Sequence, residues 1–210
     1  MVIITFETKT IDEVRDITLF SSFKEVQIFG KLTTQQAMII TSNCNWETVI
    51  FNIDMNISDI DVVLYLSKNR FWRFVYFDFC IGFQDIDIEY ISQNSSWEHL
   101  HITNTKLTPT GCKLLSTNKS WFMVDLYCTH LGDKHIQQLL QNISWKFVNL
   151  TGNVDIGNTV FQSIFDHMKS KSWLRVFIWT NRQLDETTID NCSDMIALGH
   201  YFDDNRLIPC

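Results

Sequence analysis

The sequence predicts an α/β solenoid, in which short strands and helices alternate along one stack of repeats. Two observations carry this prediction. Apolar residues stand three and five positions after most tryptophans, an alternation typical of a strand with one buried face. Six of the seven tryptophans also recur at intervals of 24 to 28 residues, namely Trp46, Trp72, Trp97, Trp121, Trp145 and Trp173. An interval of that size indicates a repeat architecture.

The strand of each repeat is predicted from its apolar pair. Seven pairs share the spacing: Val26 and Ile28, Val49 and Phe51, Val75 and Phe77, Leu100 and Ile102, Val124 and Leu126, Val148 and Leu150, Val176 and Ile178. Phe23 takes the tryptophan position before the first pair. Val2 to Phe6 is expected to end an earlier strand, and Tyr201 stands where a further repeat would open.

A helix is predicted after the turn that follows each strand, because the apolar residues there are spaced as on one face of a helix. The sets are Val62, Val63 and Leu66; Ile88 and Ile91; Leu114 and Leu115; Ile136, Leu139 and Leu140; Ile164, Phe165 and Met168. The unit is therefore strand, turn and helix, and repeats begin near residues 23, 46, 72, 97, 121, 145 and 173. One such unit cannot bury its own apolar edge, so neighbours must stack.

Position by position, these units resemble the leucine-rich repeat family, and their length resembles the ribonuclease-inhibitor subclass. The unit from Trp97 to Ser120 matches best, with tryptophan in place of the first leucine. The family's turn asparagine matches Asn153 and Asn181. The resemblance implies one domain over residues 1–210 with about seven repeats, a curved parallel sheet on the concave side and helices on the convex side. No polar caps are evident at the ends, so we expect part of a longer chain that can self-associate.

Composition excludes several functions. The net charge is -7 and the basic residues form no stripe, which argues against nucleic-acid binding. Apolar runs are too short for a membrane span. The first residues do not read as a signal peptide, so a cytoplasmic location is expected. Six Asn-x-Ser/Thr sequons leave an extracellular location open, at Asn56, Asn94, Asn118, Asn142, Asn149 and Asn191.

The candidate binding residues are the strand positions that alternate with the buried pairs. Solvent-facing positions are normally polar, yet many of these are aromatic or apolar, which is typical of a surface that binds a protein. The partner-binding prediction comprises Phe74, Tyr76, Asp78, His99, His101, Met123, Asp125, Tyr127, Phe147, Arg175, Phe177 and Trp179. An alternative is that this face packs inside a larger protein and is purely structural.

One constellation on this face bears on chemistry. His99 and His101 share a strand face, and adjacent strands bring Tyr76, Asp78 and Asp125 beside them. A metal-dependent hydrolase or metal-binding module is therefore an alternative function, and so is a histidine pair that tunes partner affinity with pH. Phosphate-loop, GxSxG and HExxH motifs are missing, so we predict neither an enzyme nor a cofactor. The family resemblance implies protein recognition, as in the sensor or regulatory repeats of innate-immune receptors.

Overall fold

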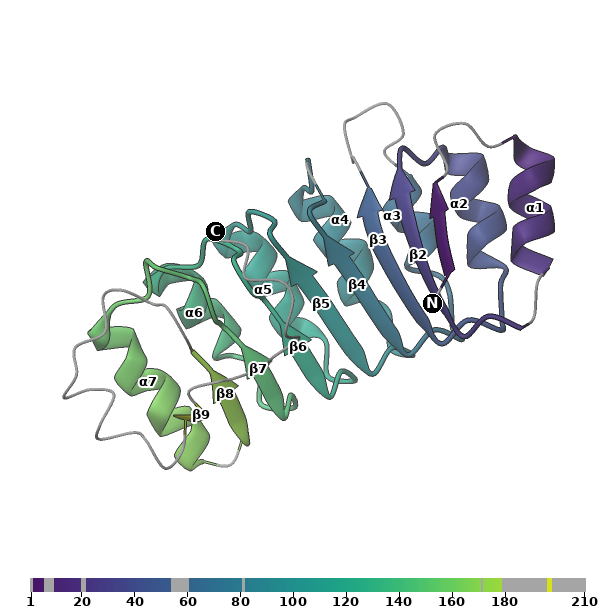
Figure 1. Cartoon of the computed structure of the whole chain (residues 1–210). Coiled ribbons are helices and arrows are strands. Elements are labelled where there is room, and N and C mark those ends of the chain that lie inside the picture. The colour runs from purple at the N-terminus through teal and green to yellow at the C-terminus, as the bar shows by residue number, and fades with distance from the viewer. Residues whose placement is uncertain are drawn as a thin grey trace.

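The chain folds as one curved stack, with strands on one side and helices on the other (Figure 1). The computed structural model describes residues 2–5, 10–19, 22–53, 61–80, 82–170, 172–178 and 196–197. Its strands form a single parallel sheet in which spatial order follows sequence order. Strands lie about 4.8 Å apart and packed helices about 8 to 10 Å apart, so the stack must curve with the sheet inside. The predicted α/β solenoid is confirmed.

The strands within the described residues are β1 (Val2–Thr5), β2 (Glu25–Gly30), β3 (Thr48–Ile53), β4 (Phe74–Asp78), β5 (His99–Thr103), β6 (Met123–Asp125), β7 (Phe147–Asn149), β8 (Arg175–Phe177) and β9 (Ile196–Ala197). The helices are α1 (Ile11–Leu19), α2 (Thr34–Thr41), α3 (Val62–Leu66), α4 (Asp85–Ser92), α5 (Pro109–Thr117), α6 (Asp133–Leu139) and α7 (Asn158–Lys169).

The predicted repeat register is confirmed by the pairing of β2 to β8. Val49 pairs with Val75, which pairs with Leu100, and the same position continues through the later strands. All of the predicted inward pairs from β2 to β8 are buried. The sheet therefore holds the seven predicted repeats, and β1 and β9 extend it at either side.

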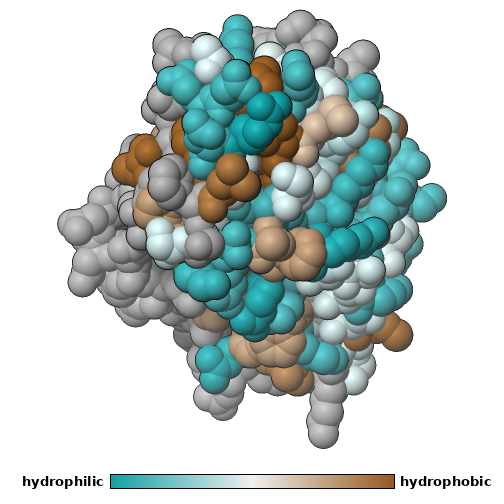
Figure 2. Space-filling view, turned by 90° about the vertical axis from the view of Figure 1, so that its right-hand side faces the viewer, coloured by the Kyte–Doolittle hydropathy of each residue, from teal (hydrophilic) through white to brown (hydrophobic). Residues whose placement is uncertain are grey.

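Helix α1 was not predicted, because no tryptophan marks its repeat. It buries Val14 and Thr18 and exposes charged residues on its other side, namely Asp12, Glu13, Arg15 and Asp16. The solvent side of this first helix is therefore polar. Figure 2 faces the end of the stack that carries α1 and shows hydrophobic groups between hydrophilic ones. Ile3 in β1 and Leu19 in α1 are exposed.

The six tryptophans of the period form the centre of the core, as predicted. Each is at most 1% exposed. Trp121 stacks on Trp145 with ring centroids 6.2 Å apart, and Trp145 stacks on Trp173 at 6.1 Å. The indoles thus fill the space between consecutive repeats, where burial of an aromatic side chain stabilises most.

A row of buried asparagines runs beside the tryptophans in the loops from helix to strand. The row, here called the asparagine ladder, comprises Asn43, Asn69, Asn94, Asn118 and Asn142, each three residues before a tryptophan. Every ladder side chain accepts a hydrogen bond from the backbone amide of that tryptophan through Oδ1. The ladder therefore sets how the chain turns into each strand.

The same side chains also join each repeat to the one before it. Asn94 Nδ2 donates to the Ser67 carbonyl at 2.7 Å and to the Asn69 carbonyl at 2.8 Å. Asn69, Asn118 and Asn142 repeat this pair of bonds toward their own preceding loops. Buried backbone carbonyls need such partners, because an unpaired one costs about as much as a lost hydrogen bond.

The ladder changes at the last described repeat. Ser170 stands three residues before Trp173, where an asparagine would continue the row. The Asn142 carbonyl still accepts from Trp173 Nε1 at 2.9 Å, and His167 Nε2, at 3.0 Å, takes the place of the missing asparagine. Burial lowers the pKa of His167, which favours the neutral ring there.

The asparagine expected from the family resemblance lies in the opposite turns, from strand to helix. Asn153 is fully buried, donates to the Leu126 and Leu150 carbonyls and accepts from the amides of Thr129 and Leu131. Asn153 thus lies in the turn that the resemblance implies and caps its backbone groups, whereas Asn181 lies outside the described residues. In the same position, Cys80 Sγ contacts the Phe51 carbonyl at 3.4 Å.

Four cysteines lie in the described residues. Cys44 is an exposed free thiol, and Cys80 and Cys112 are buried free thiols. Burial raises the pKa of Cys80 and of Cys112 to about 12, so neither is a nucleophile at neutral pH. Cys128 is disulfide-bonded.

Replacing the central tryptophan should destabilise the stack strongly. We expect Trp121→Ala to lower the free energy of unfolding by about 3 to 5 kcal/mol, because a cavity remains between two repeats. Trp121→Phe keeps most of the apolar volume and should cost less. Urea unfolding followed by circular dichroism measures the free energy of unfolding of both variants. Equal stability of Trp121→Ala and the wild type would contradict a stabilising role of this core position.

Truncating one ladder asparagine should lower the free energy of unfolding about as much as truncating a core tryptophan. Asn94→Ala deletes four hydrogen bonds and leaves their backbone partners buried, so we expect a loss of at least about 3 kcal/mol. Ser95→Ala, at the exposed neighbouring position, should change stability by less than about 0.5 kcal/mol. Similar losses for the two variants in denaturant unfolding would show that the ladder contributes little.

Candidate functional site

The strand face opposite the helices carries two aligned rows of side chains. The parallel pairing puts equivalent residues side by side. The first row runs through Thr48, Phe74, His99, Met123, Phe147 and Arg175, and the second through Ile50, Tyr76, His101, Asp125, Asn149 and Phe177. These rows are called the strand face below. Most of these side chains are half-buried, while His101 is buried and Arg175 is exposed.

Aromatic rings form a continuous run along the first row. Phe74 meets His99 edge-on with centroids 4.6 Å apart. His99 lies 6.0 Å from Phe122, which in turn lies 5.0 Å from Phe147. Such offset and tilted contacts are favourable, and they hold the rings in one rigid strip. A partner would therefore meet a preformed aromatic surface at low entropic cost.

The strip includes one residue that was not among the predicted binding residues. Phe122 directly follows Trp121 and is 48% exposed. The corresponding residues Glu47, Arg73, Glu98 and Lys146 are charged. After Trp173 the position is taken by the apolar and exposed Leu174. An aromatic residue in a position that is charged in four of the six repeats was the signal that parity alone could not use, because the position precedes the strand.

A tighter cluster occupies the second row. The Tyr76 ring stacks on His101 with centroids 3.9 Å apart and an interplanar angle of 20°. His101 Nδ1 lies 3.3 Å from Asp125 Oδ2, and His101 Nε2 is buried without a hydrogen bond. Asp125 also accepts from the Tyr127 amide at 2.9 Å. The carboxylate thus orients the imidazole, and the tyrosine covers its face.

The neighbouring histidine has a different environment. His99 is half-buried in the aromatic strip, and its pKa is lowered by desolvation and by the nearby His101. A ring in this position is favoured in its neutral form.

Asp78 is held by its own neighbours. Its Oδ1 accepts from Thr103 Oγ1 at 2.6 Å and from Asn104 Nδ2 at 2.9 Å, and its Oδ2 accepts from Asn52 Nδ2 at 3.3 Å. Gln27 extends this network by donating to Asn52. The carboxylate is thereby fixed at the carboxyl end of β4 and does not turn toward the histidines.

The metal-site hypothesis receives no support from this arrangement. Within the described parts of the chain, no three His, Cys, Asp or Glu side chains are grouped so that they could hold a metal ion. Among the helices of those segments, none combines the length and apolar character that a membrane crossing requires.

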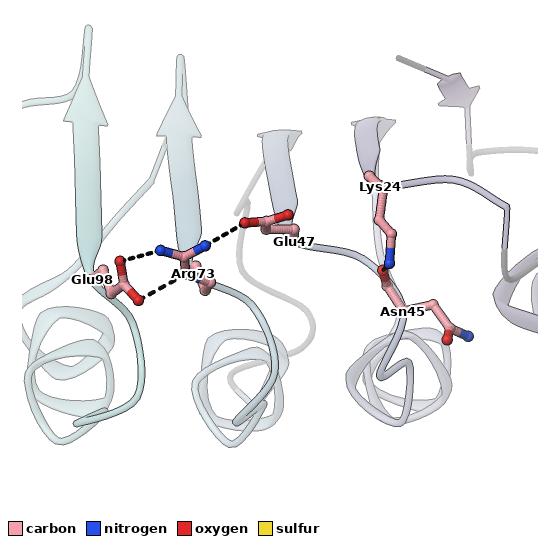
Figure 3. A network of polar contacts seen from close by, with 5 residues as sticks. All are labelled: Lys24, Asn45, Glu47, Arg73 and Glu98. Atoms are coloured by element: carbon pink, nitrogen blue, oxygen red, sulfur yellow. Dashed lines mark hydrogen bonds and ion pairs between the residues drawn. The ribbon is translucent and has the colours of Figure 1, made fainter.

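A charged edge borders the strand face where the strands begin (Figure 3). Arg73 forms two hydrogen bonds of 2.7 Å to Glu98 and an ion pair with Glu47 on its other side. The bond to Arg73 lowers the pKa of Glu98, and the same bond raises the pKa of Arg73. Because these side chains are exposed, the network contributes little to stability. It holds one positive and two negative side chains in a fixed order beside the aromatic strip.

The remaining predicted binding residues are less concentrated. Met123 lies between His99 and Phe147 in the first row, whereas Arg175 and Phe177 lie on β8 at the far side of that row. Tyr127 is half-buried in the turn after β6. Trp179 lies outside the described residues. The structure thus groups Phe74, Tyr76, His99, His101, Asp125 and Phe147 most closely.

Comparisons with known proteins add little to this description. No protein-family model matches the sequence, and no curated protein matches it. A chain in the crystal structure of the Rad7 and Elc1 complex in yeast is similar, with 11% identity over 89% of this chain and 71% of that chain. The TM-score is 0.33, so this likeness carries no argument about function or subclass.

We expect the fold to lose stability as the pH falls, in part because of His99. The lowered pKa of folded His99 means that the unfolded chain binds more protons, so stability should be lost as pH falls below about 6.5. We expect His99→Phe to lose less stability than the wild type between pH 7.5 and 5.5 in urea unfolding. His130→Asn, at an exposed position, is the control. A wild-type loss matched by His99→Phe would contradict the assignment.

Proposed function

We propose that this chain recognises a protein partner, without catalysis, through its strand face. The observation that supports this most is the rigid aromatic strip from Phe74 to Phe147, which contains the exposed Phe122. Binding energy at protein interfaces is concentrated in a few aromatic and arginine anchors. A preorganised strip on the sheet of a solenoid supplies such anchors.

The polar groups around the strip would select among partners. Glu47, Arg73 and Glu98 present alternating charge at one edge, and Asp78 and Asp125 are held in fixed orientations on the sheet. Charges at the rim of an interface set specificity and association rate more than affinity. The chain thus combines an apolar centre with a polar border, as protein interfaces do.

The repeat subclass, the kind of parent protein and the cellular location are finer parts of the proposal. The ribonuclease-inhibitor subclass is supported by helices in the convex layer, such as the 12-residue α7, although α3 has only five residues. A role in the repeat region of an innate-immune receptor rests on the family resemblance alone. For a cytoplasmic location, the buried sequon asparagines argue in favour, whereas the Cys128 disulfide is typical of an oxidising compartment.

Binding should be lost when the aromatic anchors are shortened. We expect the triple variant Phe74→Ala, Tyr76→Ala, Phe147→Ala to weaken the affinity for a captured partner at least about 30-fold, the equivalent of about 2 kcal/mol. The matched control replaces two exposed apolar residues on the helical side, Met38→Ala and Ile86→Ala. Circular dichroism and thermal unfolding must first show that both variants fold as the wild type does.

The readout is an affinity capture followed by a direct titration of the captured protein. Partners bound by the wild type and the control, but lost by the triple variant, would place recognition on the strand face. Partners lost by the control alone, or kept equally by all three proteins, would contradict the proposal. The second result would favour a binding surface outside the strand face.

A further inference from the structure

Three of the sequons coincide with the asparagine ladder. Asn94, Asn118 and Asn142 each stand three residues before a tryptophan, and the serine of each sequon directly precedes that tryptophan. The backbone amides of these serines, Ser96, Ser120 and Ser144, donate to Oδ1 of the ladder asparagines at 2.8 Å. The repeat therefore explains the asparagine of each sequon. It does not require the serine, since the amides of Asn45 and Phe71 make the same bond to Asn43 and Asn69.

The side-chain nitrogen that a glycan would modify is fully used inside the fold. Asn118 Nδ2 donates to the Ser92 carbonyl at 2.9 Å and to the Asn94 carbonyl at 2.7 Å. Asn94 and Asn142 make the same two bonds, and all three residues are at most 5% exposed. A glycan on Nδ2 replaces one of these protons and needs an open path to solvent. In the folded stack both Nδ2 protons are used in hydrogen bonds and the neighbouring repeats close the path to solvent, so a glycan cannot be accommodated on Nδ2.

We propose that N-glycosylation of Asn94, Asn118 or Asn142 and folding of the solenoid exclude each other. The folded protein then carries no glycan at these positions, and it matures on a route where they escape modification. Asn149 differs, because it is half-buried on the strand face, while Asn56 and Asn191 lie outside the described residues. The disulfide bond of Cys128 does not bear on this proposal, because disulfide formation and N-glycosylation are separate reactions.

The test is cell-free translation of the full chain, fused to a cleavable signal sequence, with glycosylating microsomes. A ladder-only variant keeps just the three ladder sequons through Ser58→Ala, Thr151→Ala and Ser193→Ala. A sequon-free variant adds Ser96→Ala, Ser120→Ala and Ser144→Ala, which retain the asparagines and their backbone partners. Each product is treated with protease after the microsomes are opened, and glycans are detected by the mobility shift on endoglycosidase treatment.

We expect the protease-resistant fraction of the ladder-only variant to show no endoglycosidase shift and any glycosylated molecules to be digested. The sequon-free variant should be resistant in both the presence and the absence of microsomes. A protease-resistant fraction that carries a glycan on Asn94, Asn118 or Asn142 would overturn the proposal.

A second variant separates protection by the fold from rejection by the enzyme. Trp121→Ala in the ladder-only background destabilises the stack and should leave a larger share of the chain unfolded with its sequons exposed, so we expect that unfolded chain to be glycosylated. If this unfolded chain also escapes modification, the fold is not what protects the asparagines, and the proposal fails on that ground.

Discussion

The solenoid depends on how each helix-to-strand loop satisfies the buried backbone of the loop before it. Such loops stack directly on one another, so their carbonyls and amides are cut off from water. The ladder asparagines meet this need from both sides, since Asn69, for example, accepts from Trp72 and donates to carbonyls of the preceding loop. A short amide side chain suits the task because it has a donor and an acceptor on one planar group.

The tryptophans and the ladder act together. The amide of each ladder-linked tryptophan is bound by its asparagine, which aims the indole into the space between repeats. The indole nitrogens of Trp97 and Trp145 then return to ladder carbonyls at 3.2 Å. The indole nitrogens of Trp46, Trp72 and Trp121 are instead buried without a hydrogen bond. Burial of the ring, which all of these tryptophans share, therefore supplies most of the stabilisation.

This arrangement leaves the strand face free to vary. Because the inward pairs fix the register of every strand, the outward residues must align in rows across the sheet. The contacts between Phe74 and His99, and between Tyr76 and His101, follow from that alignment. Under the proposed function, recognition can change by substitution on this face without altering what holds the repeats together.

The sequence predicted the features that the repeat enforces. The strands and the tryptophan core recur at fixed positions, so periodicity was sufficient to find them. The turn asparagine Asn153 was found from the family resemblance, because other residues take its position in most repeats. Helix α1 was missed because no tryptophan marks it. Parity identified the rows of the strand face, but the choice of Asp125 as the contact of His101 depends on side-chain rotamers, which sequence does not specify.

The ladder itself was visible in the sequence, as an asparagine three residues before five tryptophans. Its meaning was not, because three of those asparagines also read as glycosylation sequons and the family pattern directs attention to the opposite turn. Only burial and hydrogen bonding distinguish the two interpretations. Phe122 was overlooked for a related reason, since it lies before the strand whose alternation defined the candidate face.

The most direct test of this account is hydrogen exchange of the tryptophan backbone amides, measured residue by residue by NMR. The account predicts that the amides of Trp72, Trp97 and Trp145, which donate to ladder asparagines, exchange as slowly as the central strands. Exchange at the rate of exposed loop amides, in a protein whose strands remain protected, would contradict the claim that the ladder holds the repeats together.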